Sequence, residues 1–203
     1  MAGWTQHDGL AIALPVDNID TDQLIPARFM SRSRADGYGS HLFYDLSRDG
    51  AGNPLAEFPL NRRPDATVLI VGRNFGSGSS REAAVYALAD AGIRAVFAPS
   101  FGDIFAGNAA NNGLLAAQIS ANDASRIASA LGPGAATANI DLETRTLSLC
   151  GFSIGFELDE AKRVKLVKGW DDIDLTMHHA EDISTFRAAR HRDAPWAWPS
   201  EVT

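Results

Sequence analysis

Cysteine is nearly absent from this chain, because Cys150 is the only one among its 203 residues. A single thiol excludes an internal disulfide, and it excludes an iron-sulfur cluster or a cysteine-rich zinc site built from this chain alone. We therefore expect no metal ligands here, and any cluster that the protein needs has to come from a partner.

Positive charge is also scarce, with 18 Lys and Arg residues against 25 Asp and Glu residues and a formal net charge of -7. Because binding to phosphates requires clustered Lys and Arg, this balance argues against nucleic acid and anionic membranes as partners. The sequence lacks the run of roughly 18 apolar residues that a membrane-spanning helix needs, and its start, MAGWTQHDG, lacks a basic-then-apolar signal. These absences favour a soluble cytoplasmic protein.

The chain does contain enough apolar sequence for a substantial core. Hydrophobic residues make up 45% of it, and one domain over residues 1–203 is the default expectation at this length. From residue 68 onward the pattern predicts α/β structure in which strands alternate with helices, an order that favours parallel pairing. The expected strands cover residues 10–15, 68–71, 94–99 and 114–119, and the expected helices cover residues 80–91 and 123–131, the second capped by Asn122.

The remaining segments are less regular. Residues 30–63 are rich in Gly, Ser and Arg without a clear period, which is typical of a long functional or mobile loop. The other expected elements are a helical turn over residues 101–107, an Asn-rich turn over 108–113, hairpin strands over 139–142, 146–149 and 152–156, and C-terminal helices over 158–190 with a break near Gly169.

The most informative stretch is NFGSGSSRE, residues 74–82, which lies between an expected strand and an expected helix. Glycine allows the backbone to turn sharply or to approach a ligand closely. We expect Asn74, Gly76, Ser77 and Gly78 to shape and support the loop.

The same stretch brings two serines and an arginine to a helix N-terminus, where unpaired N–H groups and the helix dipole favour an anion. Arg81 adds a fork suited to a carboxylate or phosphate. Ser79 is a candidate N-cap, with Glu82 at the capping-box spacing. The stretch lacks the third glycine of a dinucleotide-binding loop and the Gly-Lys pair of a phosphate loop. It predicts an anion cradle with serine hydroxyls, and a purely structural glycine turn is the alternative.

Three blocks of sequence carry a resemblance to a known family, and they are VDNIDTDQLIP (residues 16–26), GRNFGSGSSRE (72–82) and APSFGDIFAGNAANNG (98–113). In this order they resemble the signature blocks of the aconitase superfamily swivelling domain, and most closely those of 3-isopropylmalate dehydratase small subunits. The resemblance covers nearly the whole chain. It implies a swivelling β/β/α domain with a mostly parallel central sheet and C-terminal helices. It also implies a separate large subunit that holds a 4Fe-4S cluster.

Roles for individual residues follow from the same resemblance. It implies that Ser79 is the catalytic base and that Ser80 and Arg81 bind a carboxylate of the substrate. A cation and a helix N-terminus would stabilise the charge that develops when a proton next to a carboxylate is removed. A serine hydroxyl needs cationic neighbours and excluded solvent to act as a base.

Other matched positions carry weaker assignments. Asp20, Thr21 and Asp22 resemble residues that line the substrate cleft, and an Asx-turn that holds the loop is an equal alternative for any one of them. Arg34 lies in the loop that reads the substrate side chain in this family. That loop, SRSRAD at residues 31–36, departs here from the usual pattern.

The resemblance implies the interconversion of 2-isopropylmalate and 3-isopropylmalate by dehydration and rehydration in leucine biosynthesis. Two alternatives stay open: the same chemistry on another alkylmalate, such as citramalate or dimethylmalate, and a non-catalytic anion-binding module. Ala83 stands where the family commonly has histidine, so support for the serines is missing or comes from elsewhere. Asn108, Asn111 and Asn112 are expected in a turn rather than at the substrate.

Overall fold

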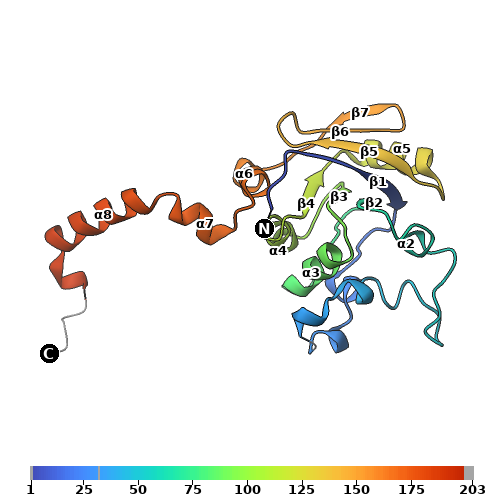
Figure 1. The fold of residues 1–203 in the computed structure, drawn as a ribbon, viewed down its shortest axis with the longest axis horizontal. Coiled ribbons are helices and arrows are strands. Elements are labelled where there is room, and N and C mark those ends of the chain that lie inside the picture. The colour runs from blue at the N-terminus through green and yellow to red at the C-terminus, as the bar shows by residue number, and fades with distance from the viewer. Residues whose placement is uncertain (1, 32, 199–203) are drawn as a thin grey trace.

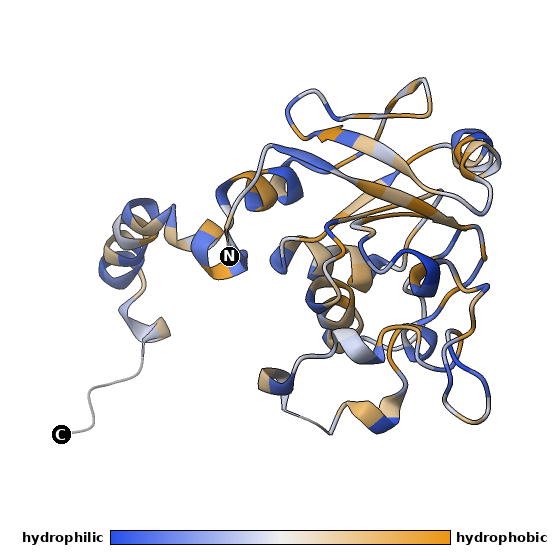
Figure 2. Cartoon of the chain, turned by 45° about the vertical axis from the view of Figure 1, so that its right-hand side comes forward, coloured by the Kyte–Doolittle hydropathy of each residue, from blue (hydrophilic) through white to orange (hydrophobic). Residues whose placement is uncertain are grey.

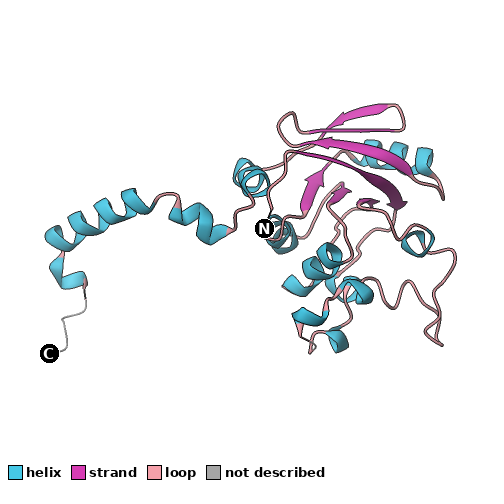
Figure 3. Cartoon of the chain, in the orientation of Figure 1, coloured by secondary structure: helices cyan, strands magenta, loops and turns pink. Residues whose placement is uncertain are grey.

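The computed structural model describes residues 2–31 and 33–198, which form a seven-stranded sheet with helices on both faces (Figure 1, Figure 3). The strands are β1 (Gln6–Leu14), β2 (Val68–Val71), β3 (Ala95–Ala98), β4 (Leu115–Gln118), β5 (Ala136–Asp141), β6 (Thr146–Leu149) and β7 (Phe152–Gly155). Every strand expected from the sequence is confirmed, and β1 and β5 begin several residues earlier than expected.

The sheet is mixed, with the strand order β4-β3-β2-β1-β5-β6-β7. Strands β1 to β4 pair in parallel, whereas β5, β6 and β7 continue the sheet from β1 in antiparallel pairs. The expected mostly parallel sheet is therefore found on one side of β1 only. Strand β1 borders both parts, because Ala11 to Leu14 pair with β2 while Gln6 to Ala11 pair with β5.

The helices and short 3-10 turns lie mostly between the strands and after them. They are α1 (Thr21–Leu24), η1 (Ala27–Phe29), η2 (Arg34–Asp36), η3 (Gly39–His41), α2 (Pro59–Arg62), α3 (Glu82–Asp90), α4 (Asp103–Asn111), α5 (Ala121–Leu131), α6 (Glu160–Lys168), α7 (Asp172–Met177), α8 (Ala180–Asp193) and η4 (Pro195–Ala197). The expected cap of α5 is wrong, because Ser120 rather than Asn122 accepts the Asp123 N–H. Within the described residues, no helix is long and apolar enough to cross a membrane.

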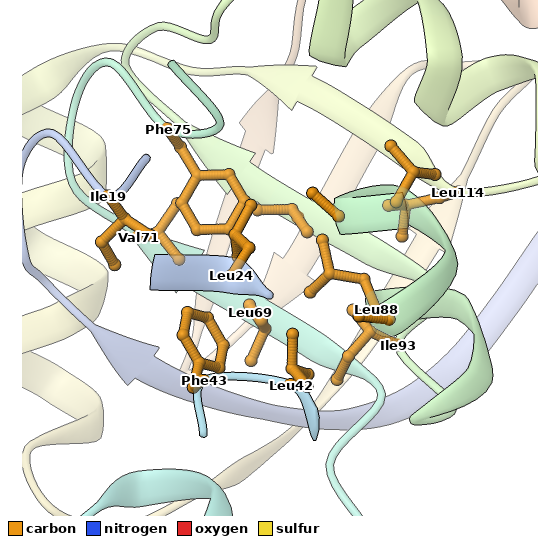
Figure 4. Packing of buried hydrophobic residues seen from close by; sticks show 14 of the residues in the cluster. Ile19, Leu24, Leu42, Phe43, Leu69, Val71, Phe75, Leu88, Ile93 and Leu114 are labelled. Atoms are coloured by element: carbon orange, nitrogen blue, oxygen red, sulfur yellow. The ribbon is translucent and has the colours of Figure 1, made fainter. Parts of the chain in front are cut away.

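Both faces of the parallel strands are buried. Leu69 and Val71 of β2 belong to one core cluster, together with Leu88 of α3, and Figure 4 shows this packing. Val68 and Ile70 belong to a second cluster on the opposite face, which α5 and the antiparallel strands complete. Burial on both faces explains why β2 is an unbroken apolar run in the sequence.

The long segment over residues 30–63 has little regular structure, as expected, yet it contributes to the core. Phe43 is fully buried, and its N–H donates to the Leu24 carbonyl of α1 (2.9 Å). The Tyr38 N–H donates to the Asp90 carboxylate of α3 (2.9 Å). These contacts fasten the segment to the two helices that flank the glycine loop.

Residues 170–198, which we call the C-terminal arm, lead away from the sheet (Figure 1). The expected break is confirmed at Gly169, which ends α6 with a left-handed φ of 73°. The root of the arm is held by Lys165 of α6, whose Nζ donates to Asn111 Oδ1 of α4 (2.9 Å) and to Asp172 of α7. Asn111 Nδ2 also donates to Asp172 (2.8 Å). The hydrogen bond from Lys165 lowers the pKa of the Asp172 carboxyl.

Candidate active site

The three sequence blocks meet at the carboxyl end of β2, in the loop that connects β2 to α3. On one side of this loop, Phe75 N–H donates to the Ser100 carbonyl (3.1 Å) and Gly102 N–H donates to the Phe75 carbonyl (2.9 Å). On the other side, Gly76 N–H donates to the Ile19 carbonyl (2.7 Å). The loop is therefore held between the segment before α1 and the segment before α4.

Gly76 is the most restricted point of the loop. Its φ of 71° lies in the left-handed region, and a Cβ placed on it would lie 2.3 Å from Cγ of the Phe105 ring. Gly78 has a φ of 95°. Asn74 has a φ of 58°, and its Nδ2 donates to Asn18 Oδ1 (2.9 Å). The path of the loop therefore depends on residues that tolerate left-handed backbone.

Thr21 fastens the second half of the loop to α1. This threonine is 2% exposed; its N–H donates to the Ser77 carbonyl (2.9 Å), and its hydroxyl donates to the Ser79 carbonyl (3.1 Å). The Ser79 carbonyl also accepts the Arg81 N–H (2.8 Å). The backbone of Ser79 is thus fixed while the residue is exposed to solvent. The alternative of Ser79 as the N-cap of α3 is wrong, because Arg81 occupies that position.

Arg81 places its guanidinium beside α1. Its side chain is 19% exposed and forms an ion pair with Asp22, whose side chain is 55% exposed. A guanidinium offers five N–H donors in a fixed fork, more than one carboxylate uses. Arg81 can therefore bind a further carboxylate, or exchange Asp22 for one.

A pocket of about 200 Å³ opens beside the loop. Its lining comes from the loop, from α1 and from the start of α4, and consists of Gly76, Ser77, Gly78, Ser79, Arg81, Thr21, Gly102, Asp103, Ile104, Phe105 and Asn108. The structure thus brings together Ser79, Arg81 and Thr21 of the predicted substrate residues. A hydroxyl and a guanidinium share one small pocket with the first turn of α4, which adds the negative charge of Asp103. The guanidinium is the group that suits a small carboxylate.

The other predicted substrate residues do not line this pocket. Ser80 follows Ser79 in the loop and is exposed. Asp20 is the N-cap of α1, where it accepts the Gln23 N–H (2.8 Å), and Gln23 in turn accepts the Asp20 N–H (2.9 Å). Asp22 reaches the site through its ion pair. Arg34 begins η2, and its side chain lies outside the described part of the chain.

The expected helical turn over residues 101–107 is confirmed as the start of α4, but its place in the pocket was not predicted. Gly102 is the N-cap of α4 and Asp103 its first residue. A glycine and an acidic residue before apolar positions form the helix-start signal at this turn. Asn108 was expected in a turn; this is wrong, because it lies inside α4 and lines the pocket.

Metal-binding side chains are not gathered at this site. Within residues 2–31 and 33–198, no group of three or more His, Cys, Asp or Glu side chains could hold a metal ion. Cys150 is exposed and lies in the turn between β6 and β7. This donor set does not fit an iron-sulfur cluster, which needs several thiolates.

Two protein-family models match this chain and define its class. Residues 1–122 match the family model of the aconitase C-terminal domain, and this range contains all three sequence blocks and the whole pocket. Residues 172–198 match the family model of the C-terminal domain of 3-isopropylmalate dehydratase small subunits. By fold and by site, the first part of the chain is an aconitase-type domain.

Individual relatives make the family assignment more specific. The 3-isopropylmalate dehydratase small subunit of Caulobacter vibrioides is 42% identical, over 97% of this chain and 98% of its own length. The Shewanella oneidensis small subunit is 45% identical, over 93% and 96%. A crystal structure of 3-isopropylmalate dehydratase from Methanocaldococcus jannaschii aligns with a TM-score of 0.65 and 27% identity, covering 89% of this chain and 98% of that one. The chain belongs to the family of 3-isopropylmalate dehydratase small subunits.

Replacing Gly76 by alanine should destabilise the protein, because the new Cβ would meet the Phe105 ring while the backbone stays left-handed. We expect the free energy of unfolding, measured by urea denaturation, to fall by about 1–3 kcal/mol. Gly107 in α4 is a matched control, since a Cβ there meets nothing within 4 Å. Gly107→Ala should be neutral or stabilise by up to about 1 kcal/mol. Equal effects of the two substitutions would contradict this account of the loop.

Proposed function

We propose that this chain is the small subunit of a 3-isopropylmalate dehydratase. This hydro-lyase interconverts 2-isopropylmalate and 3-isopropylmalate by dehydration and rehydration in leucine biosynthesis, together with a large subunit. The carrying observation is the pocket that Ser79 and Arg81 share, in a chain related over nearly its whole length to small subunits of this enzyme. The proposal includes a single swivelling domain over residues 1–203 and a cytoplasmic location.

Ser79 is the proposed catalytic base, which takes the proton from the carbon next to a substrate carboxylate. Negative charge then develops on that carboxylate, and a guanidinium and a helix N-terminus beside it stabilise the transition state. A serine hydroxyl works as a base only where cationic neighbours and excluded water favour the ionised form. Because Ser79 is exposed in this chain, the proposal requires the large subunit to cover the pocket.

Arg81 and Ser80 are the proposed ligands of a substrate carboxylate. The ion pair between Arg81 and Asp22 is partly solvent-exposed, and such pairs contribute only about 0–1 kcal/mol. A dicarboxylate can therefore displace Asp22 or share the guanidinium at little cost. The contacts of Asp20 and Thr21 favour roles in holding the loop.

The iron-sulfur cluster, and the Lewis-acid chemistry it supplies at the departing hydroxyl, belong to the large subunit in this proposal. This chain contributes the base, the carboxylate ligand and part of the pocket wall. Substrate choice is assigned to the loop that contains Arg34. Another alkylmalate, such as citramalate or dimethylmalate, is the alternative substrate.

The reconstitution experiment tests the function directly. The purified chain should be colourless, free of iron and inactive, because one cysteine cannot hold a cluster. Dehydratase activity on 3-isopropylmalate should appear when a cluster-loaded large subunit is added. Iron content, visible absorbance and turnover are the measurements. Stoichiometric iron in the isolated chain, or an inactive mixture with a loaded large subunit, would contradict the proposal.

Ser79→Ala should lower kcat of the reconstituted enzyme by about 10²–10⁴-fold, the range for loss of a general base, with little change in KM. Arg81→Lys keeps the charge but loses the fork, so it should raise KM as well as lower kcat. Ser153→Ala, at an exposed position of β7, is the control and should match the wild type. Wild-type turnover by Ser79→Ala would show that another residue takes the proton. If the chain is instead a non-catalytic anion-binding module, Ser79→Ala should lower only its affinity for the anion.

Arg34→Ala should raise KM for 3-isopropylmalate by about 10-fold to 100-fold, as expected for loss of a charge-assisted contact of about 1.5–3 kcal/mol. Arg126→Ala on α5, outside the pocket, is the control and should leave KM unchanged. The comparison is kcat/KM for 3-isopropylmalate, citramalate, dimethylmalate and citrate. If all four substrates have equal values, and Arg34→Ala changes none, the loop does not select the substrate.

A further inference from the structure

Exposed large apolar side chains concentrate on the C-terminal arm. Among residues 2–31 and 33–198 there are eight such side chains, and the five on the arm are Ile173, Met177, Ile183, Phe186 and Trp196. Phe186 is 70% exposed and Trp196 80% exposed. Figure 2 shows hydrophobic and hydrophilic stretches interleaved along the C-terminal helices.

The arm has little packing of its own. Helix α8 has 14 residues and buries none of them. An isolated helix of that length is only marginally stable in water, since most helical stability in proteins comes from packing of an apolar face. The sequence therefore provides a helix whose apolar side chains need a surface to cover them.

The root of the arm is nevertheless fixed. Lys165 is 8% exposed, and its hydrogen bonds to Asn111 and Asp172 join α6, α4 and α7. A buried ammonium with two partners holds these three elements in one arrangement. The start of α7 thus has a defined position on the body of the protein.

Helix α4 connects this root to the pocket. Its first residue, Asp103, lines the pocket, and its last residue, Asn111, binds the root of the arm. Nine helical residues span about 13 Å. Ile104, at the pocket end, is also exposed, at 54%. A partner that covers the pocket therefore lies within one short helix of the arm.

The two family matches also separate the pocket from the arm. The part that contains the pocket matches a domain named for aconitase, whereas residues 172–198, which belong to the arm, match a model named for the small subunit. A domain inside a longer chain is kept beside its neighbour by the peptide link. A separate small subunit needs non-covalent contacts instead, and the arm is the part that carries the small-subunit signature.

We propose that the C-terminal arm is a docking element that binds the large subunit through the exposed side chains of α7 and α8, with Phe186 at the centre of the contact. Aromatic residues and Met are enriched at protein interfaces, and a few residues near the centre of an interface contribute most of its binding energy. The inference rests on the proposed function, because it concerns the same partner.

The test compares two substitutions in the full-length chain. Phe186→Asp places a charge at the contact, and Ser184→Asp places the same charge about 200° around α8, on the opposite face. Titration calorimetry with a purified, cluster-loaded large subunit gives Kd for each. We expect Phe186→Asp to raise Kd at least about 10-fold and Ser184→Asp to change it less than about twofold. Circular dichroism checks that both variants are folded.

The possible outcomes distinguish failure of the arm proposal from failure of the proposed function. A Kd of Phe186→Asp equal to that of the wild type would overturn the arm proposal, even where the wild-type complex isomerises 3-isopropylmalate. Light scattering that shows a wild-type dimer dissociated by Phe186→Asp, with Kd for the large subunit unchanged, would overturn it in favour of a second copy. A wild-type complex that binds through Phe186 without turnover would reject the proposed function alone. No binding by the wild-type chain would reject both.

Discussion

The hydrogen bond from Gly76 N–H to the Ile19 carbonyl joins the loop after β2 to the segment before α1, and the rest of the site depends on it. Gly76 can make this contact because its left-handed backbone carries no Cβ against the Phe105 ring. Once the two segments are joined, Thr21 reaches the carbonyl of Ser79. The position of the proposed base is therefore set by backbone bonds between distant segments, while its side chain stays accessible.

The local elements of the fold could be predicted where burial leaves a pattern in the sequence. The run over residues 68–71 is apolar throughout because both faces of β2 are covered. The mixed sheet could not be predicted, since nothing local shows that β1 pairs with two strands of opposite direction. The end of α4 was missed because Asn is a turn former by propensity. Here Lys165 binds Asn111, and Asn112 donates to Glu82, so tertiary contacts outweigh that propensity.

The candidate site could likewise be predicted only where its signal is local in the sequence. Ser79 and Arg81 could be identified because glycines and a helix N-terminus form a local pattern with a known affinity for anions. The ion pair of Arg81 with Asp22 could not, because it joins residues 59 positions apart in the sequence. Sequence pattern indicates what a helix start can bind. It does not show which distant side chain or second helix, here α4, will share the space.

Under the two proposals, the open pocket and the exposed arm share one condition: each surface functions only when a partner covers it. Exposure of Ser79 works against its use as a base, and the exposed Phe186 side chain of α8 is not covered by this chain. Because α4 links the pocket to the root of the arm, a partner bound at either region raises the effective concentration for binding at the other. The arm can then control how often the pocket is closed without contacting the substrate. A helix remote from the chemistry would thereby influence turnover through assembly alone.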